Sequence, residues 1–139
     1  MQRALPACEL AAYVIAAALV GLPPLEDARF RSWLASSLTL ELRGCTLRST
    51  EENRPDNWGS HATASRMAVA LYLRDAAELE QAARVFKGFL DDRKAHNRFE
   101  FGDLDWQSDP GHPVGINPLG ARLHGRDVDG VLPDDQRHC

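Results

Sequence analysis

The hydrophobic and polar positions of residues 5–97 repeat with the spacing of α-helices, and four helices are predicted there. The first covers about residues 7–20 and ends at Gly21 and the Pro23-Pro24 pair, because proline cannot continue a helix. The second begins near Leu25. The apolar faces we expect are Leu10, Val14, Ile15, Ala18 and Leu19 in the first helix, and Phe30, Trp33, Leu34 and Leu38 in the second.

Two further helices are predicted between the polar stretch at residues 51–57 and residue 97. Asp75 and Glu78 resemble a capping box at the start of the fourth helix. The short joint at Arg74 and Asp75 predicts that the third and fourth helices form an antiparallel hairpin. Successive hairpins of this kind favour a stacked or ring-like all-α fold. The expected apolar faces are Ala64, Met67, Ala68 and Leu71, then Leu79, Ala82, Ala83, Phe86 and Leu90.

Residues 98–139 have a different composition, with six of the ten glycines and four of the eight prolines of the chain. Such a density of glycine and proline excludes a long regular element. The segment also carries apolar residues that need burial, which disfavours disorder. We therefore expect one domain over residues 1–139, in which 98–139 form a long irregular loop across the mouth of helical hairpins at 5–97. The apolar residues are Phe99, Phe101, Leu104, Trp106, Val114, Ile116 and Leu119.

Composition narrows the classes of partner. The net charge of −4 argues against nucleic-acid binding, which favours a basic face, although it leaves room for an acidic ligand at a local positive site. The apolar run from Leu10 to Leu22 is too short to span a bilayer, and a buried helix is favoured over a signal peptide. No metal site or cofactor is predicted, because neither the five histidines nor Cys8, Cys45 and Cys139 show a ligand spacing.

The main candidates for catalytic or binding residues lie at 57–61, Asn-Trp-Gly-Ser-His, where the polar stretch ends and the third helix begins. Ser60 is the expected N-cap, so that free backbone N–H groups would face an anion. Asn57 and His61 could then donate hydrogen bonds to a carboxylate, and His61 could help to take a proton near neutral pH. Trp58 offers a flat apolar face for a sugar ring. The alternative is that these residues only form the turn and close the core.

Four stretches resemble a known family: NRPDNWGSHATASRMAVALYLRD, ARVFKGFL, FGDLDWQSDP and GINPLGARLHGRDVDGVLPDDQR. They are similar to the alginate-lyase-like polysaccharide lyases, over about residues 10–138. The resemblance implies an (α/α) toroid that cleaves alginate, glucuronan or a related polyuronate by β-elimination, in a secreted or periplasmic setting. Such an enzyme neutralises the uronate carboxylate, removes the C5 proton and protonates the leaving oxygen. Asn57 and His61 are the predicted catalytic residues, and the predicted substrate-binding residues are Arg54, Trp58, Asp103, Asp105, Trp106, His112 and Asn117.

A complete toroid needs more helical hairpins than 139 residues can supply, so we expect an N-terminal portion that could be inactive alone. Lyases of this kind commonly use a tyrosine supported by an arginine, and these are expected beyond the chain, since Tyr13 and Tyr72 lie in apolar helices. Two alternatives stay open. One is a toroid glycoside hydrolase that uses Asp103 and Asp105 as its carboxylate pair. The other is a carbohydrate-binding remnant without catalysis.

Overall fold

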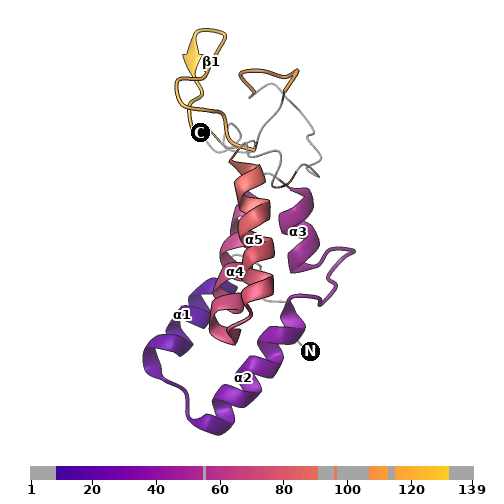
Figure 1. The fold of residues 1–139 in the computed structure, drawn as a ribbon, viewed down its shortest axis with the longest axis vertical. Coiled ribbons are helices and arrows are strands. Elements are labelled where there is room, and N and C mark those ends of the chain that lie inside the picture. The colour runs from indigo at the N-terminus through magenta and orange to yellow at the C-terminus, as the bar shows by residue number, and fades with distance from the viewer. Residues whose placement is uncertain (1–8, 55, 91–95, 97–106, 113–114, 132–139) are drawn as a thin grey trace.

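The computed structural model describes residues 9–54, 56–90, 96, 107–112 and 115–131. Within these residues the protein is all-α, as predicted, with five helices and one short antiparallel hairpin (Figure 1). The helices are α1 (Leu10–Val20), α2 (Pro24–Ser37), α3 (Leu47–Asn53), α4 (Asn57–Leu73) and α5 (Ala76–Phe89). The strands are β1 (Arg122–Leu123) and β2 (Arg126–Asp127).

The joint between α4 and α5 has the form that the sequence predicts. Arg74 closes α4 in the left-handed conformation, with φ of 59°. Asp75 caps α5, since its side chain accepts a hydrogen bond from the Glu78 backbone N–H at 3.0 Å. Only one of the two hydrogen bonds of the predicted capping box forms, however. The Glu78 carboxylate does not return to Asp75 but binds Arg48 and Arg66.

The sequence prediction missed helix α3, which brings the described helices to five rather than four. Thr46 and Ser49 form a reciprocal cap at its start. The Thr46 hydroxyl accepts from the Ser49 N–H at 3.0 Å, and the Ser49 hydroxyl accepts from the Thr46 N–H at 2.9 Å. Two turns with a single strongly apolar residue, Leu47, give too little periodicity to reveal such a helix.

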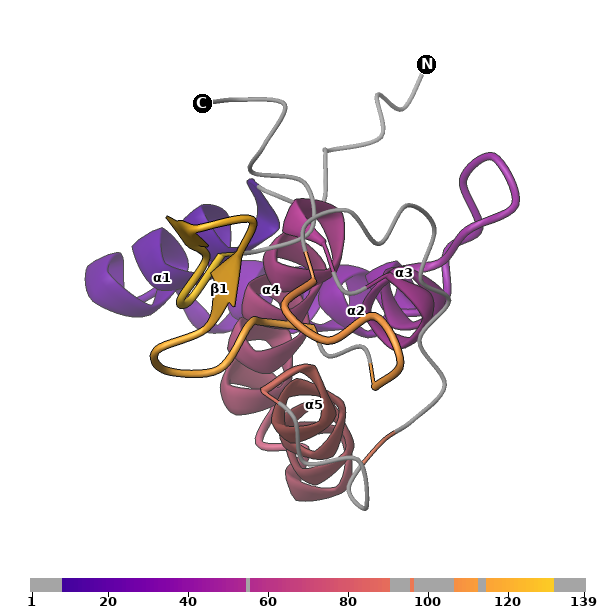
Figure 2. The same cartoon turned by 90° about the horizontal axis from the view of Figure 1, so that it is seen from above.

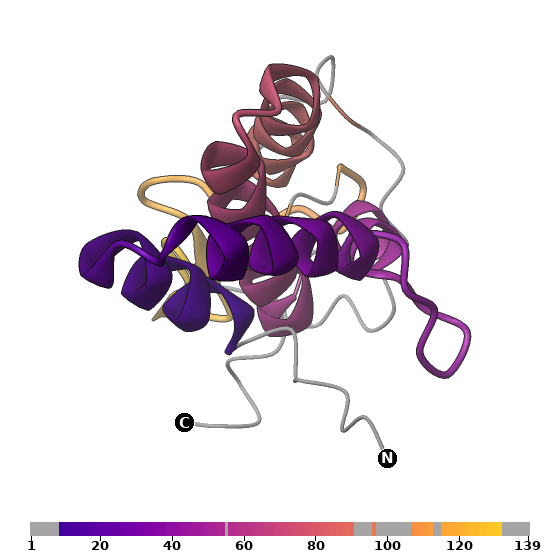
Figure 3. The same cartoon turned by 90° about the horizontal axis from the view of Figure 1, so that it is seen from below.

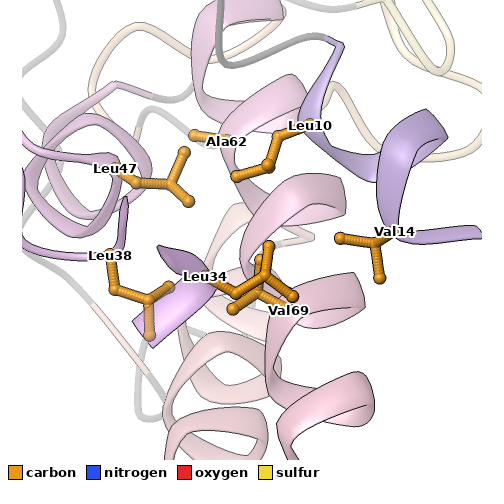
Figure 4. Close-up of a cluster of buried hydrophobic side chains, with 7 residues drawn as sticks. All are labelled: Leu10, Val14, Leu34, Leu38, Leu47, Ala62 and Val69. Atoms are coloured by element: carbon orange, nitrogen blue, oxygen red, sulfur yellow. The ribbon is translucent and has the colours of Figure 1, made fainter. Parts of the chain in front are cut away.

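Helix α4 is the centre of the helical part, and α1, α2, α3 and α5 all pack against it. Seen from below, α1 and α2 lie across α4 (Figure 3). One apolar cluster joins side chains from four of the helices and the residue that follows α2 (Figure 4). It consists of Leu10, Val14, Leu34, Leu38, Leu47, Ala62 and Val69.

The buried faces of α1 and α4 differ from the predicted ones. In α1, Leu10, Val14 and Ala17 are buried, whereas Leu19 is 82% exposed. This helix is apolar on every side, so its pattern could not select a face. In α4 the buried face includes Thr63, Ser65 and Arg66 instead of Leu71, which is exposed. The prediction chose the wrong buried face of α4 because it allowed only apolar residues in the core. None of the described helices is both long and apolar enough to cross a membrane.

The described part of residues 107–131 is largely irregular and lies beyond the end of α5 (Figures 1 and 2). Gly115 touches Phe89 so closely that a side chain at this glycine would overlap the Phe89 backbone. His124 and Gly125 both have positive φ and form the two-residue turn between β1 and β2. The Asp129 carboxylate accepts a hydrogen bond from the Gly120 N–H at 3.0 Å and so helps to fix this loop.

Candidate active site at the α3–α4 corner

A buried group of charged side chains holds α3, α4 and α5 together. This ion cluster consists of Arg48, Glu51 and Glu52 from α3, Arg66 from α4 and Glu78 from α5. Arg66 is at its centre and only 1% exposed, and its Nη1 lies 2.7 Å from Glu51 Oε2 and 3.2 Å from Glu52 Oε1. Its Nε lies 2.5 Å from Glu78 Oε1. Carboxylates from two neighbouring helices surround the arginine, and their charges and hydrogen bonds offset the cost of burying it.

Burial and the balance of charges in the ion cluster indicate which carboxyl group carries a proton. Burial raises the pKa of Glu51 to about 7, against the opposing effect of Arg66. Burial alone would raise the pKa of Glu78 as well, but hydrogen bonds from Arg48 and Arg66 outweigh it and lower that pKa. Three carboxylates face two guanidiniums, so one proton on Glu51 makes the cluster neutral. Glu51 Oε1 is buried with no hydrogen-bond partner among the described residues.

The cluster fixes α3 beside α4, and the chain turns sharply from one helix into the other. We call Arg54, Asp56, Asn57, Trp58 and His61 the α3–α4 corner. Gly59 lies on α4 against the Arg54 carbonyl group, and a Cβ atom at position 59 would overlap that oxygen. Only glycine allows the two backbones to approach this closely. The position of the corner is therefore set by main-chain contact.

Asp56, not Ser60, is the N-cap of α4, which corrects the sequence prediction. The Asp56 Oδ1 atom accepts from the N–H groups of Trp58 at 2.9 Å and of Gly59 at 3.2 Å. Ser60 lies inside the first turn, where its hydroxyl donates to the Asn57 carbonyl oxygen at 3.0 Å. The prediction of an anion site made of free backbone N–H groups is consequently wrong, because the Asp56 carboxylate already accepts hydrogen bonds from two of these groups.

Arg54 and Trp58 form an exposed platform beside the cap. The Arg54 guanidinium carbon lies 5.5 Å from the centre of the Trp58 ring, and the indole is 57% exposed. Arg54 Nη2 also lies 3.1 Å from Asp56 Oδ2. Cation, indole and carboxylate thus meet on one small surface, and the exposed indole offers a flat apolar face to a ligand.

Asn57 and His61 lie four residues apart on α4, so they share one side of the helix, with Cβ atoms about 6 Å apart in such pairs. His61 is exposed and open to a ligand. The Asn57 Oδ1 atom is buried and has no hydrogen-bond partner among the described residues. A buried acceptor without a partner costs about 1–3 kcal/mol, and a bound ligand is one way to supply that partner.

Of the other predicted binding residues the structure describes two, His112 and Asn117, and both belong to the irregular segment beyond α5. His112 is exposed, and its Nδ1 lies 2.9 Å from Asp109 Oδ2 within a turn. Asn117 is only 1% exposed and accepts from the Ser108 N–H at 2.8 Å, so it holds the loop together. Asp103, Asp105 and Trp106 lie outside the described residues, and their roles stay predictions.

Sequence reasoning missed the two features that shape the corner, Asp56 and the ion cluster. Asp56 stands three residues before Gly59 and one before Asn57, and aspartate is among the strongest N-cap residues, so the signal was present. The cluster had a weaker signal, the pair Glu51-Glu52 followed by a single Arg66 within an apolar helix. Within the described residues no group of three or more His, Cys, Asp or Glu side chains could hold a metal ion.

Comparison with known proteins finds a match to the family model described as alginate lyase, over residues 4–96. The matched range contains α1 to α5 and the whole α3–α4 corner. No curated protein and no solved structure matches the chain at a significant level.

Proposed function

Because the chain belongs to the alginate lyase family, we propose that it acts on an acidic polysaccharide, alginate, glucuronan or a related polyuronate, by β-elimination. The observation that carries the proposal is the family match over 4–96, which includes the corner that the chemistry would use. In this proposal Asn57 interacts with the uronate carboxylate, and His61 helps to remove the C5 proton. Arg54 and Trp58 bind the same or a neighbouring sugar.

The corner has the groups that this reaction requires. The C5 proton becomes acidic only when the adjacent carboxylate is neutralised, and an amide and a guanidinium can both donate hydrogen bonds to it. Imidazole is a base of suitable strength near neutral pH. The exposed indole supplies an apolar face for the C–H side of the sugar. A tyrosine and an arginine from outside these residues would complete the set.

Binding and elimination are tested separately, because the chain could bind without turnover. Calorimetric titration with polymannuronate, polyguluronate and glucuronan measures affinity, with a neutral glucan as the control polymer. Ultraviolet absorbance of a carbon–carbon double bond conjugated to the carboxylate measures elimination. Reducing-sugar release without that absorbance would indicate hydrolysis instead, and binding without either product would indicate a binding protein.

Asn57→Ala tests the site itself. We expect it to reduce elimination at least 10-fold without lowering the melting temperature, since the residue would act mainly on the transition state and its buried oxygen has no described partner to lose. Gln81→Ala removes a comparable amide from α5 and is the matched control. A large loss of stability with unchanged activity per folded molecule would show that Asn57 is structural.

A further inference from the structure

Asp56 uses its two carboxylate oxygens for two different tasks. Oδ1 caps α4 by accepting from the N–H groups of Trp58 and Gly59. Oδ2 binds Arg54, at 3.2 Å from Nε and 3.1 Å from Nη2. Since the cap fixes the carboxylate on the helix end, the ion pair in turn restrains the flexible arginine side chain beside the Trp58 ring.

This arrangement occupies the side of the guanidinium that a bound acid would otherwise use. Nε and Nη2 together form one of the edges with which arginine binds carboxylates. Both of these nitrogens point to Asp56, and no described residue pairs with Nη1. The side chain of Arg54 is 48% exposed, so a ligand can reach it, but its charge is largely balanced by its neighbour.

We propose that Asp56 limits the affinity of the α3–α4 corner for acidic sugars by competing for Arg54. The proposal rests on the proposed function, in that it takes a polyuronate as the ligand. A uronate carboxylate must displace Asp56 from Arg54 or share the guanidinium with it. The ion pair thereby weakens ground-state binding and keeps Arg54 in place over Trp58 for stacking.

Asp56→Asn separates the two tasks. Asparagine caps helices about as well as aspartate, so α4 keeps its N-cap, whereas the charge that binds Arg54 is removed. Asp75→Asn is the matched control, because Asp75 caps α5 in the same manner at the opposite end of α4. Both variants change the net charge by the same amount. Calorimetric titration of the full chain with polymannuronate and glucuronan, repeated at several salt concentrations, gives the dissociation constants.

We expect Asp56→Asn to lower the dissociation constant roughly two- to five-fold at low salt, with a steeper salt dependence, and Asp75→Asn to leave it unchanged. Equal or weaker binding by Asp56→Asn, with the wild-type protein binding normally, overturns the proposal and leaves the proposed function intact. Equal tightening by both variants shows an effect of net charge alone and also overturns it. If neither the wild-type protein nor Asp56→Asn binds a polyuronate, the proposed function and the inference are both wrong.

Discussion

Replacing Glu51 with glutamine tests whether a carboxyl group of the ion cluster keeps its proton in the folded protein. Burial raises the pKa of Glu51 from the usual 4.5 to about 7. Between these values the folded state binds one proton more than the unfolded chain, so the free energy of unfolding falls as pH rises. The contribution is fully present below pH 4.5 and is lost as pH rises through about 7. A difference of 7 − 4.5 pKa units corresponds to about 3 kcal/mol at 1.36 kcal/mol per unit.

Glutamine resembles the protonated glutamate in shape and has no charge, so Glu51→Gln removes this loss. We expect the variant to be more stable than the wild-type protein by about 1 kcal/mol at pH 5 and by about 3 kcal/mol at pH 8. Urea titrations followed by circular dichroism at four pH values between 5 and 8 measure the difference directly. Carboxyl groups outside the ion cluster whose pKa is lowered, such as Asp27, contribute equally to both proteins and cancel.

Glu80→Gln is the control, since it removes the same charge from an exposed position on α5. A difference between Glu51→Gln and the wild-type protein that stays within about 0.5 kcal/mol from pH 5 to 8 would refute the reasoning. So would a variant that is less stable at pH 8, because the Glu51–Arg66 pair would then be net stabilising in its ionised form.

Three more substitutions test the packing. Arg66→Ala should cost about 3–5 kcal/mol of unfolding free energy, because it leaves buried carboxylates without a cation; denaturant titration measures this, and a loss below about 1 kcal/mol would contradict it. Leu34→Ala should cost about 2–5 kcal/mol, whereas Leu119→Ala, at a side chain 94% exposed, should cost almost nothing; equal losses would be inconsistent with the core. Gly59→Ala should cost about 1–3 kcal/mol, since the methyl group would overlap the Arg54 carbonyl, and a rise in melting temperature would exclude that contact.

The sequence predicts those features of the fold that depend on local chemistry. The stop at Gly21 and the Pro23-Pro24 pair and the Asp75 cap both follow from local preferences of single residues, and the structure has both of them. The buried face of α4 could not be predicted in this way. Arg66 is buried only because Glu51 and Glu78 reach it from other helices, and that is a property of the packed structure.

The candidate site shows the same division. Residues 54–61 could be singled out from their types and from the resemblance, and Arg54 and Trp58 do lie together. The electrostatic character of the corner was predicted wrongly, because it depends on which residue caps the helix and Ser60 was chosen over Asp56. Moving the cap from Ser60 to Asp56 replaces exposed N–H groups with a carboxylate. Arg54 then supplies the positive charge of the corner, and its ion pair with Asp56 neutralises part of that charge.

The close approach of Gly59 to the Arg54 carbonyl has a consequence for how this surface can evolve by mutation. Main-chain atoms hold the turn in place, so the outward-facing side chains of Arg54, Trp58 and His61 carry little of the folding energy. Substitution of these three side chains could therefore give the surface new ligand preferences without a change in the packing of the helices. A library randomised at these positions should yield mostly folded proteins, in contrast to one randomised at Gly59 and Arg66.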